Sequence, residues 1–197
     1  MKNTIIKRSI TLAAVVITLS STPVFADVAL NGSYKIDPAH SNVQFSVGHL
    51  GIGNIVGRFN TVAGNFNIDS KGSSKVDVTI EVTSVDTNHE KREAHLRSPD
   101  FFNVKQYPTM KFVSDKVSYN AQGEPISVSG SFTLHGKTQN VTLTIQPVGA
   151  GKDPWGNYRA GYTATTVIKR SAFDMNFMAD GIGDDISITM NIEAIKQ

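Results

Sequence analysis

Apolar and polar residues alternate with a period of two along most of the chain. Val43, Phe45 and Val47, for example, are separated by polar or small residues. Because every second residue of a strand points to the same face, this pattern predicts strands with one apolar and one polar face. Eight segments carry it: 43–47, 62–68, 76–82, 110–112, 126–134, 141–145, 158–168 and 186–192. We therefore expect about eight strands.

Short segments rich in Gly, Asn and Asp separate these strands, for example 69–72 and 120–123. Short connections favour antiparallel neighbours. Antiparallel strands of this kind close as a barrel or pack as a sandwich. Small residues on the inward side favour a barrel with a cavity, because a packed sandwich core would use larger side chains. These residues are Gly64, Gly130, Ala160 and Ala164.

The segment from 84 to 103 breaks the alternation. Thr87 and Glu90 have the spacing of a capping box, which satisfies free N–H groups at a helix start. Pro99 disfavours helical angles at the residue before it and so ends the helix. The pattern predicts a short polar helix over residues 90–97, held by the phenylalanines that follow it. Such a polar helix is expected beside an opening of the barrel and not in its core.

The N-terminus has the pattern of a secretory signal peptide over residues 1–26. A basic start precedes a short apolar run, and Val24-Phe25-Ala26 forms a cleavage site. The apolar run is shorter than the roughly 20 residues of a membrane-spanning helix, so no stable membrane anchor is expected. We expect cleavage after Ala26, a location in the periplasm or outside the cell, and one domain over residues 27–197.

Charge and cysteine content narrow the function further. The chain has 19 Lys and Arg against 17 Asp and Glu, and three of the basic residues precede residue 27, which leaves a net charge of −1 after cleavage. A nearly neutral chain without a basic run is not expected to bind nucleic acid. With no cysteine, the protein has no disulfide and must be stabilised by an ordinary core.

No motif indicates catalysis or metal binding. His89-Glu90 begins like a zinc-protease motif, but Glu93 stands where the second histidine is required. His89 and His95 lie on different faces of the predicted helix and cannot bind one metal ion from it. The chain contains no Gly-x-Ser-x-Gly nucleophile motif. We therefore predict no catalytic residue and no metal ligand.

Three further features have structural interpretations. His49 follows Phe45 and Val47 in phase and is expected to point inward, either as a hydrogen-bonded core residue or as a polar contact for a ligand. The glycine-rich segment 51–57 is interpreted as a flexible corner between strands. Trp155 and Arg159 lie near a turn and form either a rim of the barrel or, for the tryptophan, an aromatic plug.

Several separated motifs together carry a family resemblance. They are Asp37-Pro-Ala-His-Ser41, Gly48-His-Leu-Gly51, Gly57-Arg-Phe59, Ser84-Val-Asp-Thr87, 92–102, 130–138, 153–161 and Arg170-Ser-Ala-Phe173. In this order they cover the chain from about Tyr34 to Ala194. The chain resembles the YceI-like family of polyisoprenoid-binding proteins.

The resemblance implies an all-β fold, an eight-stranded antiparallel lipocalin-like barrel with one short helix near the opening. It implies a small-molecule lipid as ligand, an isoprenoid or isoprenoid quinone, and no metal or redox cofactor. Inward residues expected to line the lipid tail are Phe45, Val47, Val78, Ile80, Phe112, Phe132, Leu143, Tyr162, Ile188 and Met190. Residues expected to contact the polar head are His49, Arg92, His95 and Arg159.

Three functional classes stay open at this point. The first is a periplasmic binding or carrier protein for a long-chain isoprenoid or similar amphiphilic lipid. The second is an enzyme that acts on such a lipid, with His49 as acid or base. The third is a ligand-free stress or interaction protein with a filled core. An exposed edge between incompletely closed strands would also be compatible with a homodimer.

Overall fold

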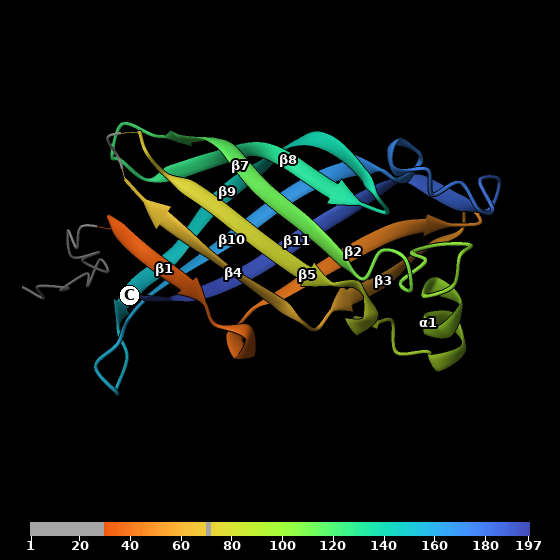
Figure 1. The fold of residues 1–197 in the computed structure, drawn as a ribbon, viewed down its shortest axis with the longest axis horizontal. Helices are drawn as coiled ribbons and strands as arrows, with labels where there is room; N and C mark the ends of the chain where they lie inside the picture. The colour runs from red at the N-terminus through yellow and green to blue at the C-terminus, as the bar shows by residue number, and fades with distance from the viewer. Residues whose placement is uncertain (1–29, 70–71) are drawn as a thin grey trace, which may run out of the picture.

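The computed structural model describes residues 30–69 and 72–197, and the predicted signal peptide lies outside them. Strands dominate, and one α-helix lies beside one end of the sheet (Figure 1). The strands are β1 (Gly32–Ile36), β2 (Asn42–His49), β3 (Gly53–Phe59), β4 (Val62–Ile68), β5 (Lys75–Glu81), β6 (Val85–Asp86), β7 (Thr109–Tyr119), β8 (Pro125–Leu134), β9 (Lys137–Lys152), β10 (Tyr158–Lys169) and β11 (Ile182–Lys196). The helices are α1 (Glu90–Leu96) and three short 3-10 turns, Pro38–His40, Val82–Ser84 and Arg170–Phe173.

The sheet closes into an antiparallel barrel. Hydrogen bonding runs in the order β1-β4-β5-β7-β8-β9-β10-β11, and β11 pairs with β1 to complete a ring of eight strands. β1 and β2 follow each other in sequence and both pair with β11, so together they occupy one position in the ring. In the same way, β3 pairs with β2 and β4 pairs with β1, so β3 and β4 together occupy the next position. The prediction of an eight-stranded antiparallel barrel is confirmed, and the sandwich alternative is wrong.

The alternation located eight strands but missed three others, β1, β3 and β6. The glycine-rich segment predicted to be a corner contains β3, which pairs with β2 over its full length. The turn itself is limited to Leu50, Gly51 and Ile52, where the first two have positive φ. Glycine has a weak strand propensity, so the sequence pattern did not indicate this strand. Its backbone hydrogen bonds come from pairing with β2.

Two inward glycines have a different role from the one predicted. A Cβ atom at Gly64 would lie 2.2 Å from the carbonyl oxygen of Asp77, and one at Gly130 would lie 2.2 Å from that of Val113. Both glycines therefore permit a close approach of neighbouring strands, as at the tightly bent parts of a barrel. Their small size does not by itself open the cavity.

Helix α1 lies at the end of the barrel that carries the β2–β3 turn, as predicted for the opening (Figure 1). The predicted capping box is wrong, because His89 is the N-cap and its Nδ1 accepts from the backbone N–H of Arg92 at 3.2 Å. Glu93, not Glu90, accepts the backbone N–H groups of Thr87 and His89. The Glu93 side chain thus reaches back across the first turn of the helix.

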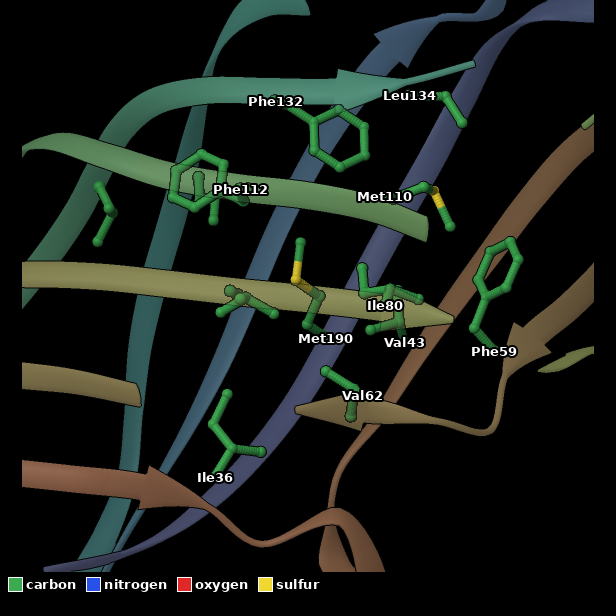
Figure 2. Close-up of a cluster of buried hydrophobic side chains, with 14 of the residues drawn as sticks. Ile36, Val43, Phe59, Val62, Ile80, Met110, Phe112, Phe132, Leu134 and Met190 are labelled. Atoms are coloured by element: carbon green, nitrogen blue, oxygen red, sulfur yellow. The ribbon is translucent and has the colours of Figure 1, made fainter. Parts of the chain in front are cut away.

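Inward side chains from all parts of the ring form the core. Figure 2 shows ten of them labelled, among them Phe112, Phe132 and Met190, pointing from different strands into one interior. Of the described residues, no helix is both long enough and apolar enough to cross a membrane.

Candidate functional site

The barrel interior contains two adjoining cavities. The larger, about 240 Å³, lies at the α1 end, and the smaller, about 90 Å³, lies further along the barrel. Ile80, Phe132 and Met190 line both and form the boundary between them. One buried water needs only about 10–15 Å³, so neither space is a packing defect. Apart from a few polar groups, the lining side chains are apolar, which suits a hydrocarbon chain.

All ten predicted tail residues line one or both cavities. The larger cavity receives Phe45, Val47 and Ile188, and the three boundary residues named above. The smaller cavity receives Val78, Phe112, Leu143 and Tyr162. The period-two alternation therefore predicted the inward side of the strands correctly. Whether a lipid tail contacts these residues stays a prediction.

Three of the four predicted head-group residues meet at the larger cavity. His49 ends β2, while Arg92 and His95 project from α1, and all three line the cavity. Nε and Nη2 of Arg92 donate to the hydroxyl and carbonyl oxygens of Thr87 at 3.0 and 2.7 Å. His95 contacts the carboxylate of Asp100 at 2.8 Å. Segments about 45 residues apart in sequence thus build one polar cluster at the cavity mouth.

Arg159, the fourth predicted head-group residue, lines neither cavity. It is out of phase with the inward Ala160 and Tyr162, so its side chain lies on the outer face near the β9–β10 hairpin. Its guanidinium contacts three carboxylates, each at 2.7 Å, from Asp37, Asp153 and Glu193. The structure thus contradicts the expected place of Arg159 at the head-group site.

These ion pairs shift the pKa values of the groups that form them. The Arg159 guanidinium lowers the pKa of Asp37 to about 2, with help from His40. It also lowers the pKa of Asp153 to about 2, and the carboxylates in turn raise the pKa of Arg159. Trp155, in the same hairpin, is 80% exposed, so it is not an aromatic plug.

The cluster most similar to a metal site within the described ranges consists of Asp37, His40 and Glu193. The Arg159 guanidinium already occupies the space between the two carboxylates. A cation there would face this permanent positive charge, so the arrangement does not suit a metal ion.

Sequence reasoning missed Arg170 as a cavity residue. It lines the larger cavity, is only 5% exposed, and donates to four backbone carbonyls of the segment that follows it. Three nearby apolar residues without a periodic pattern were missed too: Met175, Met178 and Ile182. Ile186 begins an alternating segment but was not among the predicted tail residues. The motif Arg170-Ser-Ala-Phe173, which carries part of the family resemblance, was the available signal for this residue.

A family model described as YceI-like domain matches residues 34–194. A UPF0312 protein of Pseudomonas aeruginosa is 39% identical over 191 residues, which are 95% of this chain and 98% of that protein. Among solved structures, the Campylobacter jejuni YCEI protein aligns with a TM-score of 0.65 and 30% identity over 76% of this chain and 89% of its own.

A polyisoprenoid-binding domain from Saccharophagus degradans shares the fold, with a TM-score of 0.64 and 15% identity over 83% of this chain and 98% of that domain. Both solved structures share the overall fold of this chain. This chain belongs to the YceI-like family.

Proposed function

We propose that this protein is a periplasmic binding or carrier protein for a long-chain isoprenoid or a similar amphiphilic lipid. The observation that carries the proposal is the pair of adjoining apolar cavities inside the barrel, with polar side chains gathered at one mouth. An amphiphile has the same division into an apolar tail and a polar head. Isoprenoid quinones belong to this ligand class.

The tail supplies most of the affinity in this proposal. Each CH₂ group removed from water contributes about 0.8 kcal/mol, so a chain of several isoprene units needs few specific contacts. Methionine side chains adapt to irregular shapes, and Met175, Met178 and Met190 line the larger cavity. The site can therefore accept a branched tail without a rigid match.

Further arguments concern the periplasmic location and the choice of binding over catalysis. The predicted signal peptide supports transport to the periplasm, and the Saccharophagus domain, which is described as polyisoprenoid-binding, has the same fold. For the enzyme alternative, His49 would need a partner that orients it. Within residues 30–69 and 72–197 its ring forms no hydrogen bond or ion pair, and the lining of the larger cavity contains no carboxylate. Binding is therefore the better supported function.

A pair of tryptophan substitutions on β11 tests the proposal. Ile188 lines the larger cavity, whereas Ser187 is exposed on the opposite face of the same strand. We expect Ile188→Trp to fill part of the cavity and weaken uptake of an added isoprenoid quinone at least tenfold. Ser187→Trp should bind as the parent does. Equal binding by both variants, or no uptake of any isoprenoid lipid by the parent, would contradict a lipid site in this cavity.

A further inference from the structure

The polar end of the larger cavity is built from positively charged or basic side chains. Four of them line it: His49, Arg92, His95 and Arg170. Among the described residues that line this cavity there is no Asp or Glu. A cavity wall with two permanent cations and no anion is unusual, since buried charges are normally paired.

The absence of a paired anion is clearest at Arg170. Its guanidinium donates to the backbone carbonyls of Met175, Phe177, Ile182 and Gly183, but it forms no ion pair with any carboxylate that the structure describes. Carbonyl dipoles solvate the cation, yet they leave its net charge in place. The carboxylate of Asp184 is within electrostatic range of Arg170, but it accepts from the N–H and hydroxyl of Ser171.

Arg92 has unused hydrogen-bonding capacity. A guanidinium has five N–H donors, and the two bonds to Thr87 leave three of them without a partner in the described chain. The adjacent carboxylate of Glu93 is directed at the backbone of Thr87 and His89. His49 likewise has no hydrogen-bond partner among the described residues, although its ring lines the cavity. Only His95 is paired, with Asp100.

We propose that the ligand of this cavity is an anionic amphiphile, and that Arg92 and Arg170 supply the charge that selects its phosphate or carboxylate head. The inference rests on the proposed function and narrows its ligand class. The three remaining N–H donors of Arg92 can bind phosphate or carboxylate oxygens through paired hydrogen bonds, and such charge-assisted bonds are about twice as strong as neutral ones. Arg170 already uses four N–H donors on carbonyls and contributes mainly its positive charge. A neutral head, such as that of a quinone, would leave both cations uncompensated.

The test compares two probes with the same tail. Binding of farnesyl diphosphate and of farnesol to the delipidated mature protein is measured by calorimetry, with inorganic diphosphate as a third probe. We expect farnesyl diphosphate to bind at least tenfold more tightly than farnesol, and inorganic diphosphate to bind weakly because it lacks the tail. Arg92→Gln should remove most of this preference, while Arg92→Lys should retain part of it.

Lys91→Gln is the matched control, because Lys91 neighbours Arg92 on α1 but is exposed and does not line the cavity. It should leave the preference unchanged. Equal affinity for farnesol and farnesyl diphosphate would overturn the anionic head while the lipid-binding proposal stands. Binding of neither would overturn both. Tight binding of inorganic diphosphate alone, or equal losses in the Lys91 and Arg92 variants, would overturn the assigned head-group site.

Discussion

Arginines at the two ends of the barrel have opposite electrostatic environments. Near the β9–β10 hairpin, Arg159 contacts three carboxylates on the outer face. At the α1 end, Arg92 and Arg170 line the larger cavity without an ion pair among the described residues. Carboxylates neutralise the charge of Arg159, whereas the positive charges of Arg92 and Arg170 remain available to a ligand in the cavity, although Arg170 also holds the segment after it through carbonyl contacts. Residue type alone therefore does not distinguish a structural arginine from a binding one.

The largest effect on stability is expected from Arg170→Met. Removal of the guanidinium leaves four carbonyl oxygens without their donor around a side chain that is only 5% exposed. We expect the free energy of unfolding, measured by urea denaturation, to fall by about 3–5 kcal/mol.

Lys169→Met provides the comparison for that change. Lys169 precedes Arg170, but it is exposed and pairs only with exposed or partly exposed carboxylates. Its removal should change stability little, because surface ion pairs contribute little. Similar losses in both variants would show that the carbonyl cage around Arg170 is not a stabilising feature.

A comparison of Arg159→Gln with Arg92→Gln tests whether the arginines at the two ends of the barrel have different roles, one in stability and one in lipid binding. Arg159→Gln should lower the melting temperature, because three carboxylates then repel each other, and it should leave lipid affinity unchanged. Arg92→Gln should weaken binding of an anionic lipid about tenfold, the effect of losing one charge-assisted contact, with little change in melting temperature. Reduced lipid affinity in the Arg159 variant would contradict its placement outside the site.

Acid should destabilise the Arg159 end selectively. In the folded protein the pKa of Asp37 and of Asp153 is about 2, below the usual value near 3.8, because Arg159 stabilises both carboxylates. A lowered pKa means that the folded state binds protons less readily than the unfolded state. The stabilisation is therefore complete above about pH 4 and is lost as the pH falls towards 2. Urea denaturation between pH 6 and 2.5 should show this loss, and Asp153→Asn should make it smaller.

The smallest effect is expected at Tyr162. Its hydroxyl is buried beside the smaller cavity without a hydrogen-bond partner in the described part of the chain, and burial raises its pKa. Tyr162→Phe removes this unsatisfied group and should change the free energy of unfolding by no more than about 1 kcal/mol, in the stabilising direction. A clear loss of stability would mean that the hydroxyl has a partner in solution, such as an ordered water.

Local periodicity explains what the sequence predicted well. Alternation is a property of each strand alone, so it identified the inward residues that line the cavities, from Phe45 on β2 to Met190 on β11. The same rule, applied to Arg159, would have placed it outside, since it is out of phase with Ala160.

Other features depend on contacts that no local pattern records. Strand β3 is stabilised by pairing with β2, and Arg170 is buried because the chain after it folds around its guanidinium. The cap of α1 by His89 similarly depends on the backbone geometry of that turn. Charge compensation could not be predicted either, because it requires the distances between segments far apart in sequence.

The most direct test of the central claim is extraction and mass spectrometry of the protein purified from cells that produce it, together with a native mass spectrum. We expect about one equivalent of a long-chain lipid per protein, removed by organic solvent and restored by adding the same lipid. A protein that is empty as purified, and that takes up neither isoprenoid quinone nor prenyl diphosphate, would contradict the account of the cavity as a lipid site.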